Sequence, residues 1–170
     1  LMTSPGNPLE VMRCNSMEAN DHDAKTSIDI TFPLSGSGNE LTITDDPLGL
    51  PPLVLAYIGD AVFELWIRWY LVQAGCRNVH SLHEQAVDWV NAGSQARILE
   101  VWGPTLTEEE VGIVRRGRNT KSAVPRGARV IDYRLSTGLE ALVGYLYLAG
   151  KGQRLQELLS LAVDPGRSEE

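Results

Sequence analysis

The longest apolar stretch of the chain runs over residues 53–74, and its only charged residues are Asp60, Glu64 and Arg68. Apolar residues lie on every side of this stretch when it is wound as a helix, and Gly75 follows at a position where helices commonly end. A helix that is apolar all round is typical of a central, buried position. The pattern therefore predicts a buried helix, and its three charges argue against a membrane span.

Shorter helical patterns follow, marked by residues that start and stop helices. SLHE and TEEE both match the capping box, which predicts Ser81 and Thr107 as N-caps. The further predicted helices are 81–91, 93–101, 107–116, 136 or 137 to 149, and 153–162. A glycine-, proline- and arginine-rich connection separates the third of these from the fourth. No paired strands are indicated, so the fold class predicted for residues 47–163 is an all-α bundle.

The two ends of the chain differ from this body. Residues 1–46 are polar and without a sustained period, which predicts a disordered acidic extension, and 164–170 are expected to form a flexible tail. The first twenty residues lack the apolar run of a secretory signal. Cys14 and Cys76 lie far apart and form no C-x-x-C, which fits a reducing compartment. We therefore expect a soluble, cytoplasmic protein.

The net charge of −7 hides an uneven distribution along the chain. Residues 1–50 hold eight acidic and two basic residues, whereas 115–134 hold seven basic residues and one acidic residue. The bases are Arg115, Arg116, Arg118, Lys121, Arg126, Arg129 and Arg134. A local basic segment of this kind favours a polyanionic partner, and the alternative is a solvated charged loop.

Asp60 is unusual because it interrupts an apolar pattern. At about 100° per residue, its helical stripe also contains Leu53, Ala56, Tyr57, Phe63, Glu64 and Ile67. A buried carboxylate must be paired, protonated, bound to a metal or placed at a cleft. Gly59 beside it weakens the helix and usually permits close approach of a backbone or ligand. Either Asp60 pairs with a base while Gly59 merely packs, or both belong to a functional site.

Glu140 repeats the anomaly in a later apolar helix. It shares a face with Thr137, Val143 and Tyr147, and Gly144 follows at i+4. If the two helix faces meet, Asp60 and Glu140 converge on one site, although spacing alone does not show that they meet. Carboxylate oxygens with retained waters are the ligands that Mg²⁺ prefers, so the pair is a candidate Mg²⁺ site.

The third feature is RRGRNTK over residues 115–121. Arg116, Arg118 and Lys121 are of the types that bind phosphates, and Asn119 can bond to sugar or base edges. Gly117 is expected to give the backbone freedom. A basic loop beside a carboxylate-bound Mg²⁺ would suit phosphodiester hydrolysis, because the metal activates water and offsets charge on the phosphate.

Three segments in this order, YIGDAVFELWIR, RRGRNTK and YRLSTGLEALVGYLYL, resemble Mini-ribonuclease III. This is the branch of the ribonuclease III family that lacks a double-stranded-RNA-binding domain, and the resemblance covers about residues 49–162. It implies an all-α endonuclease domain that acts as a homodimer. It further implies Mg²⁺-dependent cleavage of double-stranded RNA to 5′-phosphate and 3′-hydroxyl ends, and maturation of 23S ribosomal RNA precursor.

Carried over residue by residue, Asp60 matches the aspartate of the family's G-D element and Glu140 the glutamate of its E-A-L element. Both are thereby expected to be catalytic and metal-binding, and Arg116, Arg118, Asn119 and Lys121 to contact RNA. Larger ribonuclease III enzymes have three further carboxylates, at positions that read Leu53, Ala56 and Thr137 here. Water or Thr137 would then complete the metal shell.

Other polar and aromatic residues have simpler interpretations. Glu64 has two interpretations. It either supports the metal site from behind the ligands or forms an ion pair with Arg68 at i+4, and the ion pair is favoured. Cys76, His80 and His83 lack a suitably spaced fourth ligand for a metal site. The four tryptophans fit the core or a dimer interface better than a base-stacking platform. Two other functions remain open, a non-catalytic RNA-binding or ribosome-associated protein of the same fold and a plain helical interaction domain.

Overall fold

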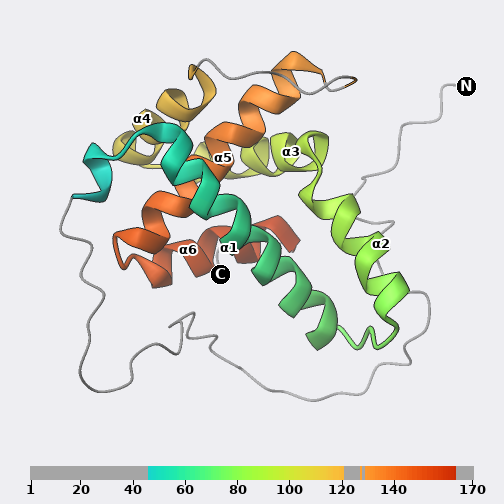
Figure 1. The fold of residues 1–170 in the computed structure, drawn as a ribbon. Coiled ribbons are helices and arrows are strands. Elements are labelled where there is room, and N and C mark those ends of the chain that lie inside the picture. The colour runs from blue at the N-terminus through green and yellow to red at the C-terminus, as the bar shows by residue number, and fades with distance from the viewer. Residues whose placement is uncertain (1–45, 121–126, 128, 164–170) are drawn as a thin grey trace, which may run out of the picture.

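The computed structural model describes residues 46–120, 127 and 129–163. Nearly all of the predicted N-terminal extension and the tail over 164–170 lie outside the described residues. The described residues contain no strand, which confirms the all-α prediction. Their helices are α1 Pro52–Gln73, α2 Val79–Val90, α3 Ala92–Trp102, α4 Glu108–Arg118, α5 Val130–Leu148 and α6 Gly152–Val163, with short 3-10 turns η1 Pro47–Gly49 and η2 Gly103–Thr105 (Figure 1). Among these described helices, none is long and apolar enough to cross a membrane.

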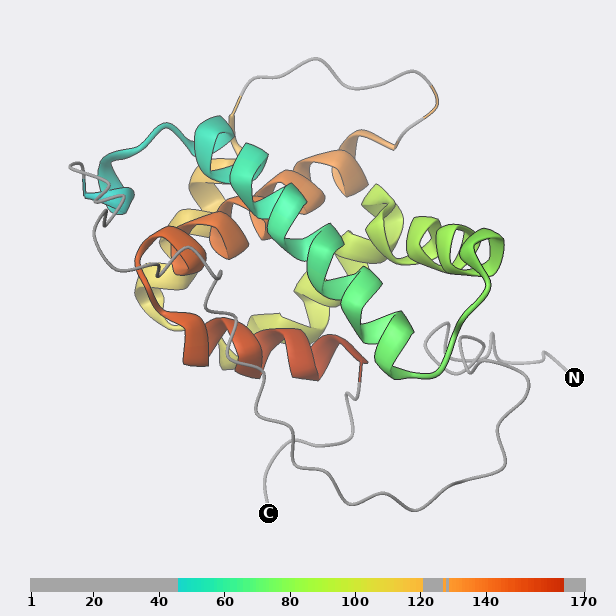
Figure 2. The ribbon, with the colours of Figure 1, turned by 60° about the horizontal axis from the view of Figure 1, so that its bottom comes forward.

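Helices α1 and α5 cross each other at the centre of the molecule, as two views show (Figure 1 and Figure 2). Glycines bring the two backbones together. A Cβ added to Gly59 would lie 1.7 Å from the backbone oxygen of Glu140, and one added to Gly144 would lie 2.0 Å from the backbone oxygen of Leu55. No side chain fits in either place, so both glycines are required for the close approach of the helices.

The central helix of the described fold is α5, and not the helix over 53–74 as the sequence pattern predicts. Residues 136–146 of α5 are buried, except for the partly exposed Glu140. Helix α1 buries one side on α5 and leaves an apolar stripe exposed, formed by Leu53, Val54, Tyr57, Leu65 and Val72. The apolar residues on all sides of α1 therefore form two faces. Other described residues pack against one of these faces, and the second face is exposed.

A single core lies around this crossing. Phe63 and Ile67 of α1 and Leu142 and Leu146 of α5 are fully buried in it. Helix α3 adds Trp102, and α6 closes the same core with three leucines that are also fully buried. Each fully buried apolar side chain contributes about 1.5–3 kcal/mol of transfer free energy, so the core rather than helix propensity holds the arrangement.

Helices α2 and α3 begin earlier than predicted. The N-cap of α2 is Asn78, whose Oδ1 accepts a hydrogen bond from the backbone N–H of Ser81 at 3.1 Å. The predicted capping box with Ser81 as N-cap is therefore wrong. Asn91 similarly caps α3 by accepting from the N–H of Ser94 at 2.9 Å. Asparagine is as good an N-cap as serine, and in both places the upstream residue takes the role.

The capping box at the start of α4 is confirmed. The Thr107 hydroxyl accepts from the Glu110 N–H, and the Glu110 carboxylate accepts from the Thr107 N–H at 2.9 Å. Glu110 is also buried and receives two hydrogen bonds from Arg154 of α6, at 2.9 and 3.0 Å. Its burial raises the pKa, but the bonds from Arg154 and Thr107 outweigh that effect and lower it.

Two helix boundaries around the basic connection differ from the prediction. Helix α4 continues to Arg118, so three of its arginines lie in its last turn, where they suit the negative end of the helix dipole. Helix α5 begins at Val130, almost two turns before the predicted start at 136 or 137. The sequence between 130 and 135 contains neither glycine nor proline, and nothing local stops the helix there.

Candidate active site

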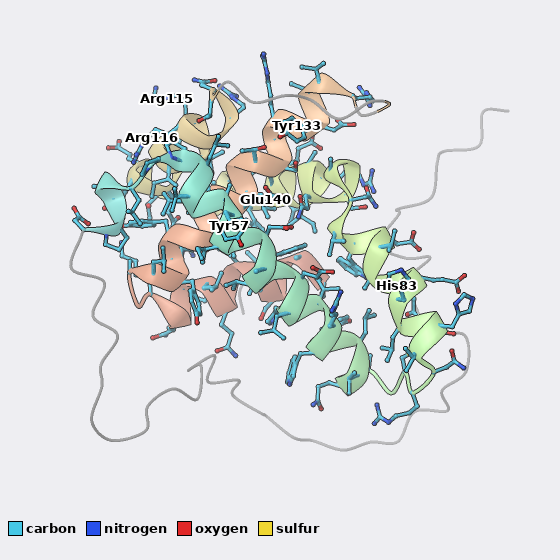
Figure 3. The ribbon with its side chains drawn as sticks, viewed as in Figure 1. Tyr57, His83, Arg115, Arg116, Tyr133 and Glu140 are labelled. Atoms are coloured by element: carbon cyan, nitrogen blue, oxygen red, sulfur yellow. The ribbon has the colours of Figure 1, made fainter. Side chains whose placement is uncertain are left out.

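The crossing of α1 and α5 brings the two predicted acids to one place. Gly59 rests against the backbone of Glu140, and Asp60 is the next residue along α1. The negative charge of Asp60 is close enough to raise the pKa of Glu140. Figure 3 shows Glu140 where α5 passes behind α1. The condition that the sequence left open, that the two helix faces meet, is thus fulfilled.

Glu140 is a carboxyl group held in its neutral form at pH 7. Burial is the main reason that its pKa rises from the ordinary 4.5 to about 8, and the charge of Asp60 raises it further. The side chain of Gln95 acts in the opposite direction by favouring the ionised form. A carboxyl group with these neighbours gains from a nearby cation, because the cation stabilises the charge that burial disfavours.

Asp60 is exposed in the described fold, which contradicts its predicted burial in an apolar stripe. Gly59 takes the position that faces α5, and Asp60 is turned to the edge of the crossing. Partial desolvation, followed by the charge of Glu64, raises its pKa above the ordinary 3.8. The charge of Asp60 is thus among the causes that raise the pKa of Glu140, whereas burial and Glu64 are the causes for Asp60.

Gln95 of α3 is the residue near this pair that the sequence interpretation missed. Its side chain faces the Glu140 carboxyl group and is only 1% exposed. The signal is present in the sequence, because Gln95 occupies the same helical stripe as Ile98, Leu99 and Trp102. A polar residue at a core position of an amphipathic helix needs a partner, and the partner here comes from α5.

The donor set of the site fits Mg²⁺. Two carboxyl groups supply hard oxygen ligands, and the exposure of Asp60 leaves room for the waters that Mg²⁺ retains. Within the described residues, no group of three or more histidine, cysteine, aspartate or glutamate side chains is placed to hold a metal. The Thr137 hydroxyl is buried and donates a hydrogen bond to Tyr133 O inside α5 at 2.9 Å.

The basic end of α4 packs against the turn of α5 that carries Glu140. A Cβ on Gly117 would lie 2.8 Å from the backbone oxygen of Thr137 and 2.9 Å from the Cβ of Ala141. Gly117 therefore serves a close helix contact, and not the loop freedom that the sequence suggested. The contact fixes the distance between the basic residues of α4 and the carboxyl pair.

The four predicted RNA contacts differ in their surroundings. The Arg116 guanidinium donates to the backbone oxygens of Leu48 and Leu50 at 2.7 and 2.8 Å, and so holds η1 against α4. Arg118 and Asn119 are exposed, and the described part of the chain offers Arg118 no hydrogen bond or ion pair. Lys121 lies outside the described residues. Figure 3 shows Arg116 at the end of α4, with Glu140 nearer the centre.

The ion pair expected for Glu64 and the core position expected for three of the tryptophans are confirmed. Glu64 forms an ion pair with Arg68 at 2.6 Å, one helical turn away. His80 lies 3.3 Å from Glu84, and His83 is on α2, away from Glu140 (Figure 3). Trp66, Trp89 and Trp102 are buried in the core, where Tyr70 stacks on the first and meets the edge of the second.

Comparison with known proteins agrees with this geometry. The Ribonuclease III domain family matches residues 53–151, a range that includes both acids and the basic end of α4. A Mini-ribonuclease 3 from Symbiobacterium thermophilum is 51% identical over 120 residues, which is 70% of this chain and 92% of the relative. One from Thermoanaerobacter is 49% identical over 125 residues, which is 73% of this chain and 88% of that relative.

Solved structures give the same result for the fold. A crystal structure of a protein from Fusobacterium nucleatum superposes with a TM-score of 0.65 at 33% sequence identity. The likeness covers 72% of this chain and 98% of that one. Family, relatives and fold agree with the helical bundle. The chain therefore belongs to the ribonuclease III family, in its Mini-ribonuclease 3 branch, and is an endoribonuclease.

Proposed function

We propose that the protein cleaves double-stranded RNA with Mg²⁺ and leaves 5′-phosphate and 3′-hydroxyl ends. The observation that carries the proposal is the pairing of Asp60 and Glu140 beside the basic end of α4. A buried carboxyl group whose pKa is raised further by a neighbouring carboxylate favours a cation, and a basic surface next to the pair favours a phosphate backbone.

Asp60 and Glu140 are the residues that would hold Mg²⁺ and act as the catalytic pair. Bound Mg²⁺ would supply a water of lowered pKa and offset the negative charge that develops on the phosphate. Glu140 loses its proton when it takes up this role, and its fixed position at the crossing orients it. Exposed Asp60 gives the phosphate of the substrate access to the pair.

Arg118, Asn119 and Lys121 are proposed to contact the RNA backbone. Arg118 and Asn119 are exposed at the end of α4, and Arg118 is free of partners among the described residues. For Arg116 we propose a positioning role instead, because its guanidinium already holds two backbone oxygens. It would reach the RNA only indirectly, through the placement of its neighbours.

A homodimer is proposed to act on one duplex. The exposed stripe of α1, which consists of Leu53, Val54, Tyr57, Leu65 and Val72, supports this proposal. Exposed apolar residues on one side of a helix favour association, and a two-fold contact through them would give the dimer two carboxyl pairs. The natural substrate that we propose is the duplex formed by the ends of 23S ribosomal RNA precursor, in the cytoplasm.

Cleavage of a structured rRNA-precursor duplex, followed on denaturing gels with Mg²⁺ or with EDTA, tests the proposal. We expect cleavage only with Mg²⁺ and a loss of at least a thousandfold in rate for Asp60→Asn, because a metal ligand is removed. Glu84→Gln is the control, since Glu84 is an exposed acid on α2 that lies 3.3 Å from His80. Undiminished cleavage by Asp60→Asn would contradict the assignment, and cleavage in EDTA would contradict the metal requirement.

A further inference from the structure

A buried amide without a complete set of partners lies behind the carboxyl pair. Gln95 is 1% exposed, and among the described residues its Nε2 has no hydrogen bond of good geometry. Its side chain is nevertheless close enough to interact with the Glu140 carboxyl group, because α3 packs directly against α5. The amide thus lies near the carboxyl group without a fully formed hydrogen bond to it.

Packing does not explain the choice of glutamine at this position. Leucine or methionine would occupy a similar volume in the stripe of Ile98, Leu99 and Trp102, without a buried polar group left short of partners. The other buried donors without partners among the described residues are the indole N–H groups of Trp66 and Trp102. The tryptophan side chains are mainly apolar, so their burial is favourable even when the N–H group has no partner. The end of the Gln95 side chain is an amide and entirely polar.

The position of Gln95 relative to the acids suggests what the amide does. Gln95 of α3 and Asp60 of α1 both act on the Glu140 carboxyl group. Gln95 is buried and Asp60 is exposed, so one neighbour belongs to the core and the other to the open side of the site. A donor from the core can therefore hold the carboxylate while the exposed Asp60 leaves the site open to a cation.

We propose that Gln95 is a positioning residue whose amide holds the Glu140 carboxylate in the orientation in which it takes a divalent cation together with Asp60. The inference rests on the proposed metal site and adds a residue that acts through Glu140. Donors behind metal ligands fix the orientation of those ligands, and their loss typically costs 10–100-fold in metal affinity. An amide is suited to this place because it supports a carboxylate without a positive charge that would compete with the cation.

The test is calorimetric titration of the RNA-free protein with Mg²⁺ alone, for wild type, Gln95→Met and Gln95→Leu. We expect both variants to bind Mg²⁺ about tenfold more weakly or worse. We also expect melting temperatures equal to or above that of wild type, because an amide short of partners is removed from the core. Weaker binding without loss of stability is a result that a purely structural role would not give.

Ser94→Ala is the matched control on the same helix. Ser94 is buried next to Gln95, but its hydroxyl donates to the backbone oxygen of Asp88 at 2.6 Å. We expect Ser94→Ala to lower the melting temperature and to keep the wild-type affinity for Mg²⁺. In cleavage assays, Gln95→Met should need about tenfold more Mg²⁺ for half-maximal rate and approach the wild-type rate at saturation.

The outcomes separate this inference from the proposed function. Wild-type Mg²⁺ affinity in both Gln95 variants would overturn the positioning role while the metal site stands. Unchanged Mg²⁺ binding by Asp60→Asn, or no binding by wild type, would overturn the proposed metal site and the role of Gln95 with it. Loss of stability in proportion to loss of binding would assign Gln95 to packing alone.

Discussion

Glu140 combines a role in the site with a cost to the fold. With a pKa of about 8 in the folded protein and an ordinary value of 4.5, it keeps its proton in the folded state over a range in which the unfolded chain has lost it. The folded state then binds more protons than the unfolded state, so its stability falls as pH rises from about 4.5 to about 8. The proposed metal site would explain why an acid stands where a neutral side chain would be more stable.

This cost leads to a prediction for Glu140→Gln. The variant should be inactive, but in EDTA it should melt at a higher temperature than wild type at pH 8, with a much smaller difference at pH 5. The reason is that glutamine cannot ionise and so does not lose stability over this range of pH. Melting curves at the two pH values measure the effect. An equal difference at both would mean that Glu140 titrates near its ordinary pKa.

Two arginines two residues apart are expected to behave differently. Arg118→Ala should weaken RNA binding and reduce the slope of log K against log salt concentration by about one, because one phosphate contact is lost. Arg116→Ala should mainly lower the melting temperature, because η1 loses its two hydrogen bonds to α4. Binding isotherms at several salt concentrations and melting curves separate the two. An unchanged salt slope for Arg118→Ala would argue against a phosphate contact there.

At the scale of elements, the α1–α5 crossing determines the site. The two acids come from separate helices, and the distance between them depends on glycines that allow backbone contact. Small shifts of the crossing would move Asp60 relative to Glu140. Asp60 follows Gly59, which touches α5, and the backbone of Glu140 is the other side of that contact. The crossing is therefore both the strongest packing feature of the fold and the frame of the site.

Gly59→Ala tests this contact. The added Cβ would lie 1.7 Å from the backbone oxygen of Glu140, so the helices must separate, at a cost of about 3 kcal/mol of unfolding free energy. Gly112→Ala in α4 is the control, because an added Cβ meets nothing within 4 Å there. It should be neutral or stabilise by up to about 1 kcal/mol, as alanine favours a helix over glycine. Denaturant unfolding measures both, and equal stabilities would contradict the packing.

At the scale of the whole molecule, the exposed stripe of α1 leaves apolar surface uncovered in one copy of the chain. If two copies cover it, Leu65→Lys should convert a dimer to a monomer, because a charge is placed in the contact. Val87→Lys is the control, since Val87 is 48% and Leu65 is 50% exposed, but Val87 lies on α2. Sedimentation velocity distinguishes the states. A wild-type monomer at working concentration would remove the proposed dimer.

The sequence alone determined much that is local. Helix periodicity predicted the number and type of the described α-helices, and capping residues placed the start of α4 at Thr107. The two acids stood out because a carboxylate in an apolar helix needs a reason, and Glu64 was assigned to Arg68 from i,i+4 spacing. These features depend on neighbours within a few residues, and a sequence pattern contains that information.

The tertiary structure decided what depends on distant neighbours. It made α5 the central helix, exposed Asp60, turned Arg116 towards η1 and placed Gln95 behind Glu140. Each of these outcomes depends on which faces pack together from helices far apart in the chain. Periodicity shows that a face is apolar but does not identify the element that covers it. The sequence therefore supplied the acids, and the packing of α1 and α5 brought them together, with Gln95 of α3 beside Glu140.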